Sequence, residues 1–236
     1  MKMRKMKVLS VIAILLFAIQ SPQSRNIEHF FITMPNIVNP ILTQQQRFEL
    51  LEFFKADMGD SITNRFGTQT RILVLDTLNN HILVQNTDIS TFEMLTVISE
   101  TDTIISIIRT VCAPICQSNI EFFDTRWEKR SDITFTFPEA VDWINAEKLE
   151  NSSLSFANVR NALNTSFISL SFFIPSPYHK SQIYEINATN NSLEFLDEKE
   201  RKLLAPLMND GVLIYGYLYP SNSGQWMKMR RLVLRQ

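Results

Sequence analysis

Residues 103–111 read TIISIIRTV, and this stretch decides the fold. Its isoleucines occupy both odd and even positions, so an extended chain here is apolar on both faces. A strand that is covered on both sides lies centrally in its sheet. Further apolar runs at residues 91–98 and 119–124 flank it at short spacing. Such short connections favour an antiparallel meander over parallel strands joined by helices.

A hairpin is predicted before the meander. Residues 71–77 and 81–85 have the composition and alternation of strands, and Asn79 and Asn80 form a tight turn between them.

A helix is predicted over residues 44–58, because Thr43 and Gln46 have the spacing of a capping box and Gly59 ends the pattern. Helical spacing predicts a buried stripe that is widened by two neighbours. The stripe residues are Phe48, Leu51, Phe54 and Met58, and the neighbours are Leu50 and Phe53.

Strands and helices continue to the C-terminus. Residues 133–137 are predicted as a strand with Ile133, Phe135 and Phe137 facing inward. The other predicted elements are helices near residues 139–146 and 157–163, a helix capped by Asp197 and Glu200, and strands at residues 167–174, 182–188, 212–219 and 225–234. The fold class is therefore α+β, with antiparallel β-meander sheets packed by a few helices. This order also allows two related α+β halves.

The start of the chain has the layout of a signal peptide, since four basic residues precede the apolar run 8–19. That run spans about 18 Å as a helix, short of the roughly 30 Å of a membrane's hydrocarbon core. We expect residues 1–22 to be a signal peptide, with no transmembrane anchor after cleavage. The expected location is periplasmic or extracellular.

The mature chain is expected to fold as one compact unit with three segments. Residues 23–137 supply the helix and meander, residues 138–166 a helical connector, and residues 167–236 the C-terminal strands and helix. The Asn/Ser-rich run within the connector makes it the best candidate for a boundary or insertion.

Composition and motifs exclude several classes of function. The five glycines are scattered, so no glycine-rich loop cradles a phosphate, and no cofactor is expected. Without the leader the chain has 19 Lys+Arg against 24 Asp+Glu, a net charge of −5, so nucleic acid is not an expected partner. Three histidines, none spaced for joint ligation, predict no metal site. No motif of a nucleophile elbow or a zinc protease occurs.

The two cysteines, Cys112 and Cys116, flank Pro114. A turn at Pro114 brings them within disulfide distance, whereas a continuous strand holds them about 13 Å apart. An oxidising compartment favours the disulfide. Buried free thiols are the next alternative. A redox role is weaker because the spacing is not that of a C-x-x-C motif, and metal binding is weaker still because no histidines are spaced for joint ligation.

An aromatic row is the strongest candidate for ligand recognition. Tyr215, Tyr217 and Tyr219 alternate on a predicted strand, and Trp226 lies across the following turn. Such a row can stack on the sugar rings of a glycan, and it can equally be cross-strand packing beneath a helix.

A set of positions along the mature chain forms a pattern typical of one known family. They are Met34, Pro35, Pro40, the helix at residues 47–53, Asn64, Gly67, Thr110, Val111, Pro114, Ser118, Phe122, Phe123, Asp124 and Trp127. In these residues the chain resembles a secreted family catalogued as domain of unknown function 3256, found largely in Bacteroidales. The resemblance covers nearly the whole mature chain and implies a signal peptide and an envelope or extracellular home. It transfers no substrate, cofactor or catalytic residue, and the cysteine pair departs from the family's pattern.

Exported proteins of this bacterial group carry O-glycans on Asp-Ser/Thr-aliphatic sites. Ser61, Thr77 and Thr103 have that local pattern, and we expect at least one of these hydroxyls to carry a glycan.

Three functions follow from these features. The first is a non-catalytic binding or envelope-associated module with a glycan or an envelope protein as partner. The second is a hydrolase of envelope or dietary glycan polymer, which requires paired carboxylates, or a histidine such as His179 beside a nucleophile. The third is a structural or assembly partner, for which an uncovered sheet edge is the sign. The sequence favours them in that order, and no catalytic motif supports an enzyme.

Overall fold

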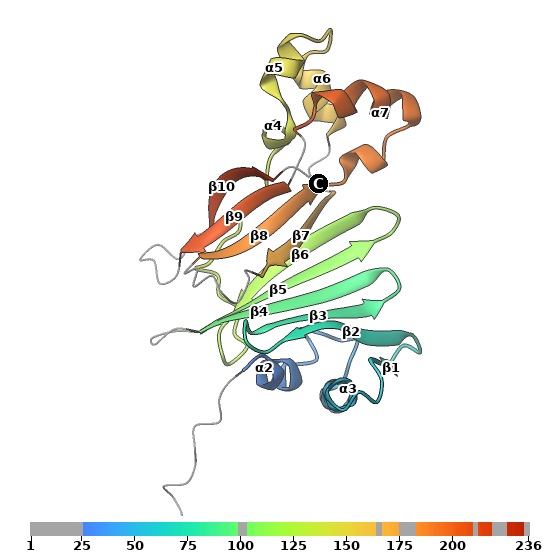
Figure 1. Cartoon of the computed structure of the whole chain (residues 1–236), viewed down its shortest axis with the longest axis vertical. Helices are drawn as coiled ribbons and strands as arrows, with labels where there is room; N and C mark the ends of the chain where they lie inside the picture. The colour runs from blue at the N-terminus through green and yellow to red at the C-terminus, as the bar shows by residue number, and fades with distance from the viewer. Residues whose placement is uncertain are drawn as a thin grey trace, which may run out of the picture.

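The computed structural model describes residues 26–98, 103–163, 167–174, 183–209, 212–218 and 226–233. These residues form two antiparallel sheets and two groups of helices, so the expected α+β class is confirmed (Figure 1). The six-stranded sheet has the order β1-β2-β3-β4-β5-β6 and the four-stranded sheet the order β10-β9-β8-β7.

The strands follow the predicted meander closely. Those of the first sheet are β1 (Ser61–Thr63), β2 (Gln69–Asp76), β3 (His81–Thr87), β4 (Ser90–Ile98), β5 (Thr103–Cys112) and β6 (Cys116–Phe123). Those of the second are β7 (Ile168–Phe173), β8 (Ile183–Asn190), β9 (Val212–Leu218) and β10 (Trp226–Val233). The β2–β3 hairpin pairs Asp76 with His81, and Asn80 adopts a φ of 52° in its turn. An asparagine tolerates this left-handed conformation better than most residues.

The helices lie at opposite ends of the molecule, with both sheets between them (Figure 1). At one end are α2 (Ile27–Thr33) and α3 (Gln44–Lys55). At the other are α4 (Ala140–Trp143), α5 (Ala146–Glu150), α6 (Phe156–Ala162) and α7 (Glu198–Leu204), with the 3-10 turns η1 (Ser192–Glu194) and η2 (Ala205–Leu207). No helix among the described residues is long and apolar enough to cross a membrane.

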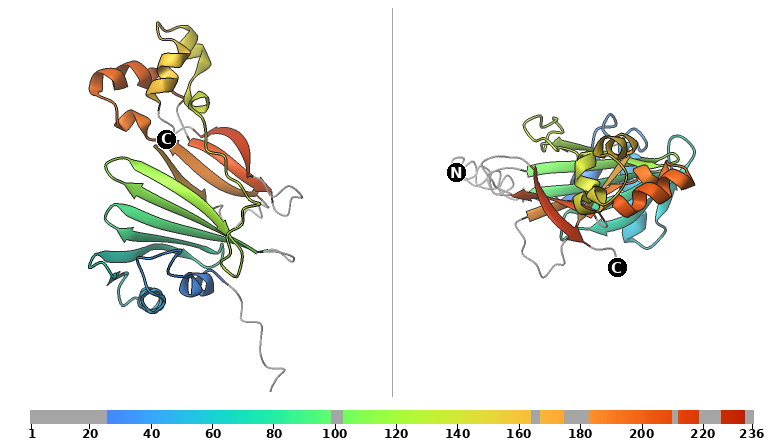
Figure 2. Two further views of the ribbon diagram at one scale, coloured as in Figure 1. Left: turned by 180° about the vertical axis from the view of Figure 1, so that it is seen from behind. Right: turned by 90° about the horizontal axis from the view of Figure 1, so that it is seen from above.

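The first sheet is the middle layer of three. One of its faces packs against α2 and α3, and the other packs against the second sheet and the distal helices (Figure 2). The first core lies between this sheet and α2 and α3, and the second core lies between this sheet, the second sheet and the distal helices. β5 supplies Ile105 and Ile107 to the first core and Ile104 and Ile108 to the second core. The prediction of a central strand covered on both sides is therefore confirmed.

The buried stripe of α3 was predicted correctly only in part. The capping box of Thr43 and Gln46 is present, but the helix ends at Lys55 rather than at residue 58. Leu50 and Leu51 are buried as predicted, and Phe54 packs against the same core. The prediction was wrong for Phe48, Phe53 and Met58, which are 45%, 39% and 74% exposed. The buried face also carries Arg47.

Arg47, which the predicted stripe did not include, is completely buried. Its guanidinium donates to the carbonyl oxygens of Leu42 at 2.6 Å, of Met34, and of Ile32 at 3.3 Å. Burial lowers the pKa of Arg47 to about 10. The arginine thereby fixes α2 and the Pro-containing lead-in onto α3, because each of these carbonyls lacks a helical partner of its own.

Residues 133–137 do not form a strand, contrary to the prediction. They belong to no helix or strand of the structure. The inward face was correct, since Ile133 is buried and Phe135 and Phe137 pack against the second core. The alternation therefore reports burial of one face rather than ladder pairing.

The two sheets are joined by side chains that reach the free edge of β7. The backbone amide of Leu170 donates to Ser118 Oγ at 2.9 Å, and that of Phe172 donates to Glu93 Oε2 at 3.3 Å. The other carboxylate oxygen, Glu93 Oε1, lies 2.8 Å from His81 Nε2. An edge strand that presents unpaired amides is thus satisfied by buried acceptors from the neighbouring sheet.

One core links the three segments expected from the sequence. It includes Leu95, Trp143 and Ile168, one from each of residues 23–137, 138–166 and 167–236. The boundaries of those segments remain a prediction.

Candidate functional site

The aromatic row lies partly within the described chain. Tyr219 falls outside it, and only the backbone register is described for the other three residues. In that register position 215 lies opposite Ile186, and position 217 lies between Tyr184 and Trp226. Directly opposite residues share a face of a sheet, so position 215 falls on the face from which Ile186 enters the core. The ligand-binding role of the row remains a prediction.

The cysteines form a disulfide that closes the turn between β5 and β6. Cys112 and Cys116 are direct partners in the ladder, with a Cα–Cα distance of 3.8 Å. Disulfides are typical of proteins in oxidising compartments.

The three candidate glycosylation hydroxyls differ in setting. Ser61 in β1 and Thr103 at the start of β5 are half-buried, whereas Thr77 in the β2–β3 turn is exposed. Beside Thr77, the Asp76 carboxylate accepts hydrogen bonds from Leu78 and Asn79, which fixes the turn. Burial opposes ionisation of Asp76, but these hydrogen bonds outweigh it and lower its pKa. Thr77 is the most accessible of the three hydroxyls.

A buried histidine–carboxylate pair lies between the sheets. The side chains of His81 and Glu93 are only 5% and 8% exposed. Phe172 contributes an edge-on ring contact to His81 and an amide to Glu93. His81 Nδ1 is buried without a partner among the described residues. Through Glu93 this pair links the first sheet to β7 of the second sheet. His179 lies outside the described residues.

A charged network joins β5, β6 and the segment between α2 and α3. Glu121 accepts from Arg109 and from Lys129, the latter at 2.7 Å, while Arg109 also donates to Val38 O. Burial opposes ionisation of Glu121, but these two cations outweigh it and lower its pKa. No cluster of three or more His, Cys, Asp or Glu side chains suited to a metal ion occurs in the described part of the chain.

A pocket of about 800 Å³ opens between α4 and α6, and it is called the α4–α6 pocket below. Phe156 and Arg160 are four residues apart on α6 and therefore share one side of the helix, and Leu163, which follows the helix directly, also lines the pocket. The facing wall is the beginning of α4. Among the described residues, the lining consists of Glu139, Ala140, Val141, Phe156, Arg160, Asn161 and Leu163.

Local capping sets the two walls. Ser155 Oγ accepts from the amide of Asn158 at 3.3 Å and begins α6. Asp142 accepts from the amide of Glu139 at 2.8 Å and begins α4. Both caps follow from the preference of small polar and acidic side chains for the first turn of a helix.

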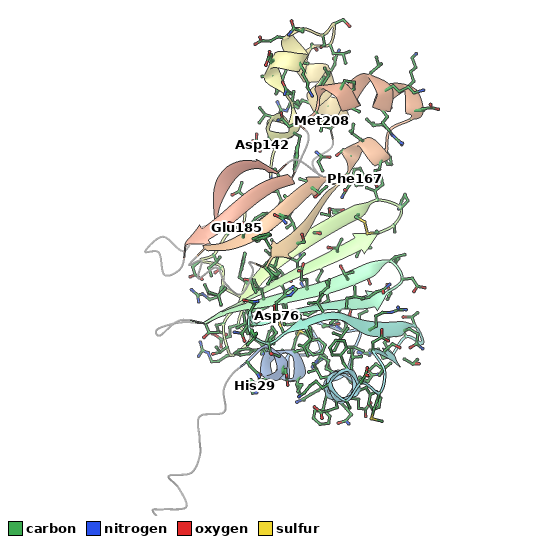
Figure 3. All side chains as sticks on the ribbon, viewed as in Figure 1. His29, Asp76, Asp142, Phe167, Glu185 and Met208 are labelled. Carbon is green, nitrogen blue, oxygen red and sulfur yellow. A yellow bond between two sulfur atoms is a disulfide. The ribbon has the colours of Figure 1, made fainter. Side chains whose placement is uncertain are left out.

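The α4 wall is fixed to the C-terminal part of the chain. Asn209 donates through Nδ2 to the carbonyl oxygens of Asp142 at 3.3 Å and Ile144 at 3.2 Å. An isolated bridge pairs Ile144 with Met208. Figure 3 labels Asp142 and Met208 at this end of the molecule. Met208 and Asn209, which are distant in sequence, thus hold the α4 wall of the pocket in place.

The pocket combines an apolar base with a polar rim. Ala140 and Leu163 are 4% and 2% exposed and belong to the second core, whereas Val141 and Phe156 are 50% and 42% exposed. Glu139 stands on one wall and Arg160 on the other. Within the described residues the guanidinium of Arg160 has no ion-pair or hydrogen-bond partner. A few polar groups around apolar surface are characteristic of small-ligand pockets.

Sequence reasoning missed this pocket. Its described lining comes from the predicted helical connector at residues 138–166, and none of these residues forms a motif. One signal was present: Phe156 and Arg160 share a helix face with Leu163, an arrangement that leaves an aromatic ring beside a cation.

The fold and the pocket define an α+β protein with two stacked antiparallel sheets and a ligand-sized opening between short helices. The chain belongs to the family described as protein of unknown function (DUF3256), whose model matches residues 19–217. The resemblance predicted from the sequence is thereby confirmed.

A solved structure of a domain of an uncharacterized protein from Porphyromonas gingivalis W83 has a similar fold. Its TM-score is 0.65 at 22% identity, over 86% of this chain and 98% of that chain. At this identity the likeness shows the fold alone. No curated protein matches the chain.

Proposed function

We propose that this chain is an exported, non-catalytic protein that binds a ligand in the α4–α6 pocket. The observation that carries the proposal is the pocket itself, with a volume of about 800 Å³. Small-ligand sites typically occupy roughly 300–1,000 Å³ and place a few polar groups around apolar walls. The rigid attachment of α4 through Asn209 supports a preformed site.

Two features support export. The basic start followed by the apolar run 8–19 has the layout of a signal peptide. The disulfide between Cys112 and Cys116 fits an oxidising compartment such as the periplasm or the extracellular medium. Mass spectrometry of the protein from its host should find a mature N-terminus within residues 20–25. Protein that retains Met1 and stays in the cytoplasm would contradict export.

The absence of catalysis rests on the chemistry of the pocket. Among the described residues, Glu139 supplies the only carboxylate of the lining, and no described histidine, cysteine or serine lines it. General acid–base hydrolysis of a glycan requires two carboxylates at a defined separation. The buried pair of His81 and Glu93 is committed to the junction between the sheets.

Ligand-observed NMR tests binding. The purified protein is screened against sugars, amino acids, short peptides and acyl carboxylates, and hits are repeated with Phe156→Ala. Phe48→Ala is the matched control, because Phe48 is 45% exposed on another helix and Phe156 is 42% exposed in the pocket. Hits that weaken only with Phe156→Ala support the proposal. A screen without hits, or hits insensitive to both variants, would overturn it.

A second function is favoured by the edge of the first sheet. β1 pairs only with Gln69–Arg71, so residues 73–76 of β2 have no outer strand partner in the described chain. Leu73 and Val74 are 45% and 40% exposed there. This edge suits an assembly partner that adds a strand. Leu73→Lys should abolish such assembly in sedimentation experiments, and an unchanged assembly would exclude this edge.

A further inference from the structure

We propose that the ligand of the α4–α6 pocket is a short peptide, with a free carboxylate bound by Arg160 and an apolar side chain on the pocket's base. This inference rests on the proposed function and narrows it to one chemical class. It follows from the charges, the apolar surface and the amide of the lining taken together.

The charges of the lining match a ligand with charges of both signs. Arg160 belongs to α6 and Glu139 precedes α4, so opposite charges stand on different walls. A guanidinium binds a carboxylate through two parallel hydrogen bonds, and a carboxylate accepts from an ammonium group. A peptide with free termini carries both groups. A phosphorylated ligand would favour several cations, and Arg160 is the only cation that the described residues contribute to the lining.

The base of the pocket suits an aliphatic or aromatic side chain. Leu163 and Ala140 continue the protein core, and Val141 and Phe156 leave about half of their surface exposed beside them. Covering this surface with an apolar group removes it from water, which is favourable in proportion to its area. A neutral sugar offers less apolar surface and no charge for Arg160.

Asn161 completes the match. Its side-chain amide carries both an acceptor oxygen and a donor NH₂ group. A peptide bond presents the complementary donor and acceptor. The side chain of Asn161 has no hydrogen-bond partner within the described residues. It is therefore available to a bound peptide backbone.

Isothermal titration calorimetry of the full protein tests the inference with the tripeptide Ala-Leu-Ala. The comparison probes are the same peptide with a C-terminal amide and the neutral sugar maltotriose. The variants are Arg160→Gln in the pocket and Arg71→Gln as the matched control, since Arg71 is exposed on β2, outside the pocket lining.

C-terminal amidation and Arg160→Gln should each weaken binding about tenfold, the usual effect of losing one charge-assisted contact. The two losses should not add, because both remove the same ion pair. Arg71→Gln should leave the affinity unchanged. Losses that add, or an equal loss with Arg71→Gln, would overturn the role of Arg160.

Other results separate this inference from the proposed function. Maltotriose binding that Phe156→Ala abolishes and Arg160→Gln does not would overturn the peptide class while supporting a ligand pocket. The peptide class would also be overturned, and the ligand pocket supported, if the tripeptide did not bind while another compound in the NMR screen bound and was weakened by Phe156→Ala. If no compound bound in either the NMR screen or the calorimetry, both the inference and the proposed function would be overturned.

Discussion

The helices at the two ends of the molecule are held in different ways. α2 and α3 cover their sheet with Phe30, Phe31 and Leu50, each at most 1% exposed, and Arg47 ties them together from inside. α6 buries only Val159, and its Phe156 stays 42% exposed beside an unpaired Arg160. At the α2–α3 end the side chains pack tightly against the sheet. At the α6 end an apolar side chain and a charged side chain remain accessible, as the binding of a ligand requires.

This difference separates the residues that stabilise the fold from the residues that line the α4–α6 pocket. The same residue types, phenylalanine and arginine, serve as structural anchors at one end and line a pocket at the other. Identical substitutions at the two ends therefore measure the division directly, and the predictions below are ordered by the size of the expected effect.

The largest contrast is between Phe30→Ala and Phe156→Ala. Phe30 is 1% exposed and Phe156 is 42% exposed. Phe30→Ala should lower the free energy of unfolding by about 3–5 kcal/mol, because it leaves a cavity in the core. Phe156→Ala should lower it by about 0.5 kcal/mol or less. Urea denaturation of both variants measures the contrast, and equal losses would break the comparison.

The two arginines give the second contrast. Arg47→Gln should lower the free energy of unfolding by about 3 kcal/mol, because carbonyl oxygens of Ile32, Met34 and Leu42 lose buried donors. Arg160→Gln should have an effect near zero, since an exposed arginine without a partner contributes little. Thermal denaturation followed by circular dichroism tests both. An Arg47→Gln protein of unchanged stability would show that the hydrogen bonds of Arg47 do not contribute to the stability of the fold.

The junction between the sheets should show an intermediate effect. Glu93→Ala removes the acceptor of the Phe172 amide and the partner of His81 together. The expected loss is about 2–3 kcal/mol in urea denaturation, because both groups stay buried and unpaired. Glu93→Gln, which keeps one acceptor oxygen, should lose less. Equal losses for the two variants would contradict the hydrogen-bonding role of Glu93.

Removal of the disulfide should cost about 2 kcal/mol through the loop-closure entropy of a short loop. Cys112→Ala combined with Cys116→Ala tests this in thermal denaturation, and chemical reduction of the unmodified protein provides the comparison. The two treatments should lower the melting temperature alike. An unchanged melting temperature would mean that the bond adds nothing to the β5–β6 turn.

The smallest effect depends on pH. The pKa of Glu121 is lowered in the folded protein, so its stabilising contribution is present above its unfolded pKa and is lost as the pH falls through the folded value. Glu121→Gln should lower the free energy of unfolding by about 1 kcal/mol at neutral pH. The difference from the unmodified protein should shrink below about pH 4. The exposed Glu150→Gln is the control, and a pH-independent difference would contradict the account.

Much of the fold was predictable from local signals. The isoleucines of β5 and the turn at Asn79 and Asn80 specify strands whatever the rest of the chain does. The capping box of Thr43 and Gln46 is equally local. These features were predicted correctly because short-range chemistry decides them.

Features that depend on distant contacts were missed. A buried arginine on α3 was not expected, because a charge enters a core only when the tertiary structure supplies its partners, here carbonyls of residues 32–42. The pocket arises for a similar reason: its walls are short helices positioned by Asn209 and by the core rather than by their own sequence. No local pattern encodes either feature.

Hydrogen exchange of the full protein, with and without Ala-Leu-Ala, tests the central claim that one end stabilises the fold and the other binds. We expect slow exchange in β4, β5 and α3, faster exchange in α4 and α6, and peptide-induced protection confined to residues 139–163. Protection centred on α2 and α3, or none at saturating peptide, would contradict the claim.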